Sequence, residues 1–311
     1  MEQQGERVEM ASSQTDVLGA TWRDYLEMCK PRVVLLMLLT TLVGMFIAVP
    51  GGAAPSTFLL LTSLTGIALV AGSAAVINHV ADAHIDRKMA RTHARPVAQG
   101  RVSFTEALVF SSVIGCIGMW ILVTQVNVLT AWLNLLSWAG YGLLYTLFLK
   151  RRTSQNIVIG GLFGAAPPLF GWTAVTGEIA LEPLLLVLIV FVWTPPHFWA
   201  LAIDRVEEYQ KSGVPMLPVT HGDMHTRWNI FCYTVLLAIC AVLPFFLGTL
   251  GAFYFASAIV LGGVFLHYAI AIVRKRPGSE MQAFRYSILY LGLLFAAVLI
   301  DHHGAAVLAA I

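Results

Sequence analysis

Nine long apolar runs follow one another along the chain, separated by short polar or glycine-rich segments. A helix needs about 20 apolar residues to cross the hydrocarbon core of a bilayer, and most of these runs approach that length. Because that core offers the backbone no hydrogen-bond partners, each spanning run must be an α-helix. The pattern predicts an all-α membrane protein, a bundle of nine transmembrane helices at residues 33–49, 57–81, 104–124, 128–149, 157–176, 183–203, 229–247, 252–273 and 287–300.

The basic residues orient this predicted bundle. All 19 Lys and Arg residues fall before the first run or in the segments after the second, fourth, sixth and eighth runs. Cytosolic segments of membrane proteins carry the excess of Lys and Arg. We therefore expect a cytosolic N-terminus and an external C-terminus, with residues 1–30 as a cytosolic tail and residues 31–311 as the transmembrane domain.

The composition agrees with a membrane location. Only 12% of the residues are charged, about half of the roughly 25% that is usual in soluble domains. The first 20 residues contain four acidic residues and the single basic residue Arg7, which fits neither a secretory signal nor an Arg-rich transit peptide. We therefore expect a bacterial inner membrane rather than that of an organelle.

The segment after the second run places three oxygen-bearing side chains four residues apart. On a helix, Asn78, Asp82 and Asp86 would share one face. Such a row suits a hard cation such as Mg²⁺, which takes carboxylates together with phosphate oxygens. Arg91 and Arg95 follow at the same spacing and can grip phosphate oxygens through paired hydrogen bonds. The alternative is a solvated loop whose charges only set the topology.

A second acidic pair follows the sixth run on the same predicted side of the membrane. Asp204 and Glu208 are again four residues apart. Two acidic helix ends on one side would make a two-metal clamp around a diphosphate. Taken alone, this pair is also compatible with a solvated polar loop.

Basic residues and two histidines complete the candidate chemistry. Lys150 and Arg151 close the fourth run, where they can bind either a phosphate or anionic lipid headgroups. His197 and His267 are the exceptional ionisable residues within the runs, away from the ends. A polar group at that depth is costly and therefore suggests a function, with a packed, hydrogen-bonded histidine as the alternative.

These residues resemble the intramembrane prenyltransferases of the UbiA type over nearly the whole chain. The first motif marks the family, and the later ones resemble its haem-farnesylating branch. The motifs are Asn78-x3-Asp82-x3-Asp86-x2-Met89-x-Arg91-Thr92-x2-Arg95-Pro96, Tyr145-Thr146 with Lys150-Arg151-Arg152-Thr153, Gly160-Gly161-x2-Gly164-Ala165-x-Pro167-Pro168-x2-Gly171-Trp172, Pro196-His197-Phe198-Trp199, and Glu208-Tyr209 with Gly213-Val214-Pro215-Met216-Leu217-Pro218.

The resemblance implies a fold and a set of residue roles. The nine helices would surround a central cavity that opens to lipid. One Mg²⁺ would be held by the first motif and a second by the later acidic pair, so the expected metal ligands are Asn78, Asp82, Asp86, Asp204 and Glu208. The expected catalytic residues are Asn78, Asp82, Asp86 and Arg95. The expected substrate-binding residues are Arg91, Tyr145, Lys150, Arg151 and His197, the last of these toward the haem iron or a propionate.

The implied reaction joins a farnesyl group from farnesyl diphosphate to a vinyl group of haem B, with Mg²⁺ as the cofactor and haem as a substrate. The product would carry a hydroxyethylfarnesyl side chain. The implied partners are farnesyl diphosphate, haem B, membrane lipid and haem A synthase or terminal-oxidase assembly factors, with no nucleic acid.

Three alternatives remain at this stage. A related prenyltransferase acting on an aromatic quinone precursor would show the same acidic segments, but the Pro196-His197-Phe198-Trp199 motif argues against it. A non-enzymatic haem protein with His197 and His267 as paired axial ligands leaves the acidic segments unexplained. A transporter would be expected to place carboxylates near the middle of the membrane, where this chain has none.

Overall fold

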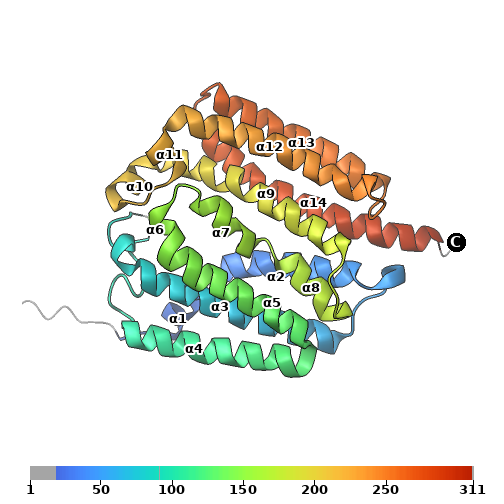
Figure 1. Cartoon of the computed structure of the whole chain (residues 1–311), viewed down its shortest axis with the longest axis horizontal. Coiled ribbons are helices and arrows are strands. Elements are labelled where there is room, and N and C mark those ends of the chain that lie inside the picture. Colours follow the sequence, from blue (N-terminus) through green and yellow to red (C-terminus); the bar gives the residue numbers. More distant parts are fainter. Residues whose placement is uncertain (1–18, 91, 310–311) are drawn as a thin grey trace, which may run out of the picture.

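The computed structural model describes residues 19–90 and 92–309, with side chains up to residue 304, and every regular element in this part of the chain is helical (Figure 1). A short 3-10 turn, η2 (Pro50–Gly52), follows α2, and two π-helical segments, η3 (Leu122–Val126) and η4 (Ala139–Leu149), extend α4 and α5. The α-helices are α1 (Trp22–Met28), α2 (Pro31–Ile47), α3 (Thr57–Asp86), α4 (Phe104–Ile121), α5 (Val128–Trp138), α6 (Lys150–Arg152), α7 (Asn156–Gly164), α8 (Pro167–Thr176), α9 (Leu181–Asp204), α10 (Val206–Ser212), α11 (Leu217–His221), α12 (Asp223–Phe246), α13 (Ala252–Val273) and α14 (Ser279–Ala309).

Seven helical stretches in the described residues are long and apolar enough to cross a membrane: Thr57–Asp86, Phe104–Val126, Asn156–Thr176, Leu181–Asp204, Asp223–Phe246, Ala252–Val273 and Ser279–Gly304. Helices α1 and α2 add an eighth if the pair, bent by 52°, is taken as one span. The remaining predicted run, residues 128–149, falls on α5 and the wider turns of η4. The structure therefore supports a multi-pass, all-helical membrane protein, while the count of nine spans stays a prediction.

Helix α3 is longer than the sequence pattern predicted. It begins after Ser56, whose hydroxyl accepts a hydrogen bond from the backbone N–H of Leu59 at 3.3 Å. It ends at Asp86 rather than near residue 81. No Gly or Pro interrupts the intervening residues, so nothing in the backbone stops the helix where the side chains become polar. The first acidic motif consequently lies on regular helix.

Close backbone contacts pack α2 against α8. A Cβ atom on Gly44 would lie 2.1 Å from the carbonyl oxygen of Pro168, and one on Gly171 would lie 1.9 Å from the carbonyl oxygen of Thr41. Any larger residue at either position would force the two helices apart. This contact fixes the helix that begins just after Lys30, a residue of the site described below.

The glycines of the motif at residues 160–164 differ in how closely they are packed. A Cβ atom on Gly160 would lie 2.5 Å from the ring of Tyr145, and one on Gly161 would lie 2.9 Å from the methyl group of Thr194. Both positions therefore need glycine for close packing. At Gly164, by contrast, nothing lies within 4 Å of the Cβ position.

The two proline pairs also differ in effect. Pro167 and Pro168 begin α8 and separate it from α7, as proline at a helix start allows. Pro195 and Pro196 instead lie inside α9, which continues through them to Asp204.

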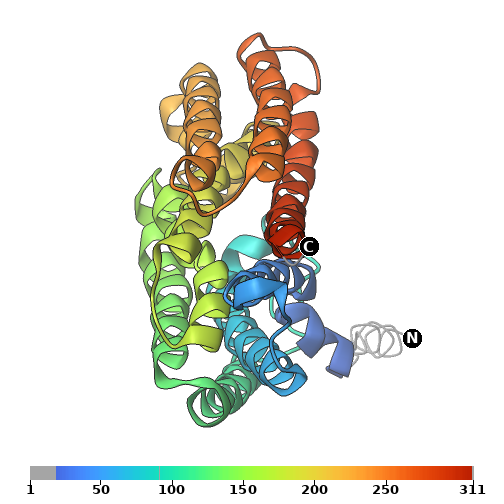
Figure 2. The same ribbon diagram turned by 90° about the vertical axis from the view of Figure 1, so that its right-hand side faces the viewer.

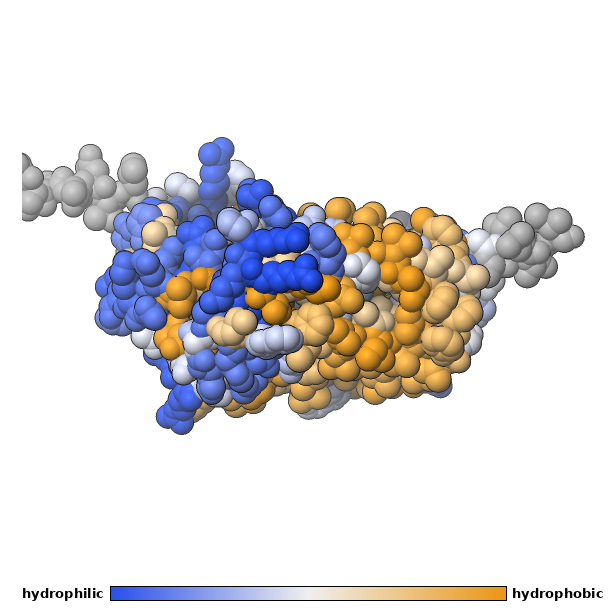
Figure 3. Space-filling view, turned by 90° about the horizontal axis from the view of Figure 1, so that it is seen from above, coloured by the Kyte–Doolittle hydropathy of each residue, from blue (hydrophilic) through white to orange (hydrophobic). Residues whose placement is uncertain are grey.

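Polar residues gather at one end of the bundle. The connections between α3 and α4, between η4 and α7, from α9 to α12 and between α13 and α14 all lie at the left end of Figure 1. Figure 3 shows hydrophilic residues concentrated at that end and apolar residues over the body. Viewed from the other end, α12 to α14 lie on one side of the molecule and α3 to α5 on the other (Figure 2).

A buried ion network ties the C-terminal helices together at the polar end. The Arg227 guanidinium, 9% exposed, bonds to Asp223 at 2.8 Å, to Glu280 at 2.7 Å and to the carbonyl oxygen of Ile272 at 2.7 Å. These partners belong to α12, α14 and α13. The network fixes the relative positions of the three helix ends.

Candidate active site

The last three turns of α3 present the first acidic motif on one buried face. Asn78, Asp82 and Asp86 are 4%, 0% and 3% exposed. Asn78 Nδ2 donates a hydrogen bond to Asp82 Oδ2 at 2.9 Å. The expected clustering on one helix face is confirmed, and the alternative of a solvated loop is wrong for these three side chains.

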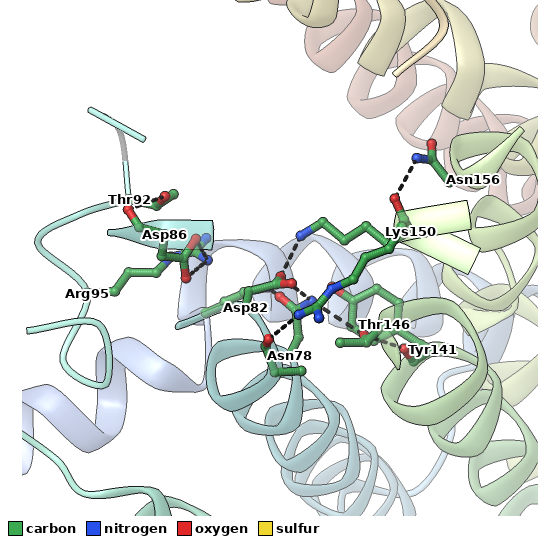
Figure 4. Close-up of polar contacts among 12 residues, drawn as sticks. Asn78, Asp82, Asp86, Thr92, Arg95, Tyr141, Thr146, Lys150 and Asn156 are labelled. Atoms are coloured by element: carbon green, nitrogen blue, oxygen red, sulfur yellow. Dashed lines mark hydrogen bonds and ion pairs between the residues drawn. The ribbon is translucent and has the colours of Figure 1, made fainter. Parts of the chain in front are cut away.

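Three basic side chains from separate segments reach this face. Arg95 Nη1 donates to both carboxylate oxygens of Asp86, at 2.9 and 2.7 Å, and Lys150 Nζ lies 2.5 Å from Asp82 Oδ2 (Figure 4). Lys30 Nζ donates to Asn78 Oδ1. Three cations beside two carboxylates leave an excess positive charge, which suits an anionic ligand.

The burial of these charges argues for function rather than stability. Removing two ions from water costs several kcal/mol each, and their attraction often does no more than offset that cost. Asp82 Oδ1 is also fully buried and has no hydrogen-bond partner. An unpaired buried carboxylate oxygen costs about 1–3 kcal/mol or more, which makes Oδ1 a candidate contact for a ligand.

The donor set fits Mg²⁺ completed by ligand oxygens. Within the described ranges, no three His, Cys, Asp or Glu side chains lie close enough to hold a metal by themselves. Asp82 and Asp86 with the amide oxygen of Asn78 supply only part of a shell. Mg²⁺ is commonly held by one or two carboxylates together with substrate phosphate oxygens, which this set matches.

The second acidic pair is arranged differently from the expectation of one helix face. Helix α9 ends at Asp204, and Glu208 lies on the separate helix α10. Arg205, between them, bonds to Asp204 Oδ2 at 3.1 Å and to Glu208 Oε1 at 2.9 Å. The break at Arg205 separates two side chains that a continuous helix would have aligned. Glu208 Oε2 is buried without a partner. The role of Asp204 and Glu208 as metal ligands stays a prediction.

Two other predicted substrate-binding residues, Tyr145 and Arg151, belong to the stretch from η4 to α6 that lies against α3. The ring of Tyr145 stacks on Tyr141, with the centroids 5.5 Å apart. Arg151 Nη2 donates to the carbonyl oxygen of Ala81 at 2.5 Å, so it contacts the backbone of α3 rather than a carboxylate. Arg91 lies outside the described residues.

Two further residues, Lys30 and Thr146, contact the row but were given no role from the sequence. Lys30 joins α1 to α2 in a left-handed conformation, with φ 51° and ψ 58°. Such backbone in a residue other than glycine costs about 1–3 kcal/mol and is typical of functional positions. Thr146 accepts a hydrogen bond from Asn78 Nδ2 at 3.4 Å. A lysine directly before the proline that begins α2, two residues ahead of the first predicted run, was the one available signal for Lys30.

The two intramembrane histidines have different environments. His197 is buried on α9 and contacts α14, whereas His267 is an exposed residue of α13 whose ring lies 5.9 Å from that of Tyr268. The ring contacts of His197 involve Trp193, Phe198 and Phe284, and none of them is shared with His267. Among the described residues the two rings share no contact, so the structure lends no support to the alternative in which they are paired axial haem ligands.

A cavity of about 170 Å³ lies at the end of the bundle away from the acidic face. Its walls come from the ends of α2, α8, α9, α12 and α14, and include Glu182 and His302. It is therefore separate from the α3 site. The predicted central cavity around that site stays a prediction.

The fold and the site together define a class of protein: a helical membrane protein with a buried, net positive acid–base cluster at one membrane end. The chain belongs to the UbiA prenyltransferase family, whose model matches residues 37–299.

Curated relatives cover almost the whole chain. Protoheme IX farnesyltransferase from Teredinibacter turnerae is 55% identical over 293 residues, 94% of each chain. The protein of the same name from Stutzerimonas stutzeri is 57% identical over 285 residues, 91% of this chain and 95% of the relative. That from Legionella pneumophila strain Paris is 57% identical over 287 residues, 92% of this chain and 97% of the relative.

Solved structures share the fold at low sequence identity. A structure concerning digeranylgeranylglyceryl phosphate synthase in membranes matches with a TM-score of 0.75 at 19% identity, covering 91% of this chain and 98% of that one. A UbiA homologue from Archaeoglobus fulgidus, bound to GPP and Mg²⁺, matches with a TM-score of 0.65 at 16% identity, covering 88% and 99% of the two chains.

Proposed function

We propose that this enzyme transfers a farnesyl group from farnesyl diphosphate to a vinyl group of haem B, giving haem O and diphosphate. The site observation that carries the proposal is the buried Asn78–Asp82–Asp86 row with its excess of positive charge. The choice of haem and farnesyl rests on relatives that are 55–57% identical over at least nine-tenths of the chain and share one name.

The proposed reaction breaks the bond between C1 of the farnesyl group and the diphosphate oxygen, and the electron pair leaves with the diphosphate. The terminal vinyl carbon of haem B then bonds to C1, which moves the positive charge to the neighbouring carbon. The oxygen of a water molecule bonds there and releases one proton to the diphosphate or the solvent. Haem B, farnesyl diphosphate and water thus account for all atoms of haem O and diphosphate.

The residues of the α3 site favour departure of the diphosphate. Mg²⁺ held by Asn78, Asp82 and Asp86 would supply charge neutralisation at the phosphate oxygens. Lys150, Arg95 and Lys30 reach the same face and would exchange their α3 partners for phosphate oxygens when the anion binds. Donors that are already positioned in a dry site stabilise developing charge strongly.

Further residues extend this proposal around the leaving group. Arg91 and Arg151 would contact the diphosphate, and Asp204 and Glu208 would hold a second Mg²⁺. The stacked Tyr141–Tyr145 pair offers aromatic faces to the allylic cation. His197, on α9, would contact haem.

We also propose the membrane setting expected from the sequence. Nine spans would place residues 1–30 in the cytosol, residues 31–311 in and around a bacterial inner membrane, and the C-terminus outside. Haem A synthase or a terminal-oxidase assembly factor would receive the product.

Reporter fusions test this topology. A fusion after Leu149 should report the cytosol, and one after Thr249 should report the outside, because the basic residues follow the fourth run and are absent near Thr249. Alkaline phosphatase and fluorescent-protein fusions at both points give opposite signals in this arrangement. Matching signals would contradict the nine-span count.

Product analysis tests the reaction. Purified protein with haem B, farnesyl diphosphate and Mg²⁺ should produce haem with the added mass of one farnesyl group and one hydroxyl group, measured by mass spectrometry. Product should vanish with a chelator and return with Mg²⁺, because the departing diphosphate needs charge neutralisation. An aromatic quinone precursor is offered in parallel as an acceptor. Prenylation of that precursor, with haem unmodified, would replace the proposal by the related alternative.

A further inference from the structure

The imidazole ring of His197 is fixed on both faces by aromatic rings. Trp193, one turn earlier on α9, stacks with its centroid 4.3 Å away at an interplanar angle of 16°. Phe284 of α14 stacks with its centroid 4.6 Å away at 20°. The ring therefore cannot tilt, and only rotation within its own plane remains to be restricted.

Ser287 supplies that restriction. His197 Nδ1 lies 2.6 Å from Ser287 Oγ, and Ser287 Oγ donates its hydrogen to the carbonyl oxygen of Phe284 at 2.7 Å. Trp193 Nε1 donates to the carbonyl oxygen of the same serine at 2.8 Å. The two hydrogen bonds that His197 and Trp193 of α9 make with α14 thus both involve Ser287.

The two contacts of Ser287 Oγ favour one tautomer of the imidazole. A serine hydroxyl has one hydrogen, so both contacts of Ser287 Oγ are hydrogen bonds at once only when that hydrogen goes to Phe284 and Nδ1 of His197 carries the other. In the neutral ring, Nε2 then has a lone pair and no hydrogen. Nε2 bonds to none of the described residues, and it is not among the buried polar atoms sealed without a partner.

We propose that Ser287 is a positioning residue that holds His197 with Nε2 ready to bind the haem iron. A lone pair can coordinate iron, but a nitrogen without hydrogen cannot donate to a propionate carboxylate. Of the two haem contacts that the sequence left open for His197, the geometry selects the iron. Histidine ligands commonly donate their other N–H to such an acceptor, which fixes tautomer and orientation. The inference rests on the proposed function, in which haem is a substrate.

Haem titration of the full chain, without prenyl diphosphate, tests the proposal. Ser287→Ala should weaken haem binding by about 10-fold to 100-fold, the usual effect of removing a partner of a metal-ligating histidine. It should also lower the iron–histidine stretching frequency of ferrous haem in resonance Raman spectra, because Nδ1 loses its acceptor. Ser287→Thr keeps the hydroxyl and should restore both values. The matched control is Ser63→Ala, which removes a buried hydroxyl that has no partner and should change neither.

A second variant keeps the ligand assignment falsifiable if Ser287→Ala folds poorly. His197→Gly opens a slot between Trp193 and Phe284, so added imidazole should enter it and restore an iron–imidazole band that the variant lacks. An iron–histidine band that persists in His197→Gly without imidazole would overturn the assignment. Unchanged affinity and frequency in Ser287→Ala would overturn the positioning role.

The haem-binding experiments and the product assay test the two proposals independently. Haem farnesylation by a wild-type protein that shows no iron–histidine band would overturn this inference and leave the proposed function intact. A band that depends on His197 and Ser287, in a protein that never modifies haem, would support the ligand assignment and overturn the proposed function.

Discussion

Asp82→Asn should lower turnover by a hundredfold or more while leaving haem binding unchanged. The substitution keeps the size of a fully buried side chain but removes the charge that faces Asn78 and Lys150. It also replaces one of the two carboxylate oxygens, either the unpaired Oδ1 or Oδ2, with an amide nitrogen, which cannot bind a cation. Loss of one pre-positioned electrostatic group typically costs about 10²–10³ in turnover. The measurement is the rate of haem O formation at saturating Mg²⁺ with haem and farnesyl diphosphate.

Glu207→Gln is the matched control for this prediction. Glu207 belongs to the second acidic segment, but its carboxylate is 82% exposed and lies 3.9 Å from Lys211. Such a surface pair contributes roughly 0–1 kcal/mol, so its loss should change neither rate nor stability appreciably. Normal turnover by Asp82→Asn would remove the central residue of the proposed site and, with it, the prenyltransferase mechanism derived from that site.

The helical architecture was predictable because membrane burial leaves a strong and local signal. Each predicted run coincides with helical segments, since apolar residues in lipid must satisfy their backbone hydrogen bonds within one helix. The row at Asn78, Asp82 and Asp86 was predictable for a similar reason, because the period of a helix is a property of the sequence itself. The end of α3 was misplaced because polarity, rather than a helix-breaking residue, was taken as the boundary.

The partners of that row were not fully predictable, because tertiary packing decides them. Lys30 lies 48 positions before Asn78 and reaches it only through the left-handed turn between α1 and α2. The arrangement of Asp204 and Glu208 depends on one break at Arg205, whose φ of −113° and ψ of 22° leave the helical region. No spacing rule carries that information. The exposure of His267 likewise depends on which face of α13 meets its neighbours.

Lys150→Met should also lower turnover on the order of a hundredfold, and its effect should not add to that of Asp82→Asn. Lys150 Nζ lies 2.5 Å from Asp82 Oδ2, so the two act on one ligand as a unit. Groups that act together show strongly non-additive losses. The double variant should therefore turn over at about the rate of Asp82→Asn alone.

The double variant should be more stable than Lys150→Met alone. Two residues that contributed to stability independently would give the opposite result. Lys150→Met leaves the fully buried Asp82 carboxylate without its cation, and breaking a buried pair on one side costs about 3–5 kcal/mol. Adding Asp82→Asn removes the stranded charge and should recover part of that loss in thermal unfolding of the detergent-solubilised protein. Lys211→Met, at a side chain 74% exposed, is the control and should leave both rate and unfolding temperature near those of the wild type. A double variant that is less stable than Lys150→Met, or slower by the product of the two single losses, would show that Asp82 and Lys150 do not act as one ligand-binding unit. Recovery of stability without recovery of rate is the result expected if the pair holds charge in place for a diphosphate and does little for the fold.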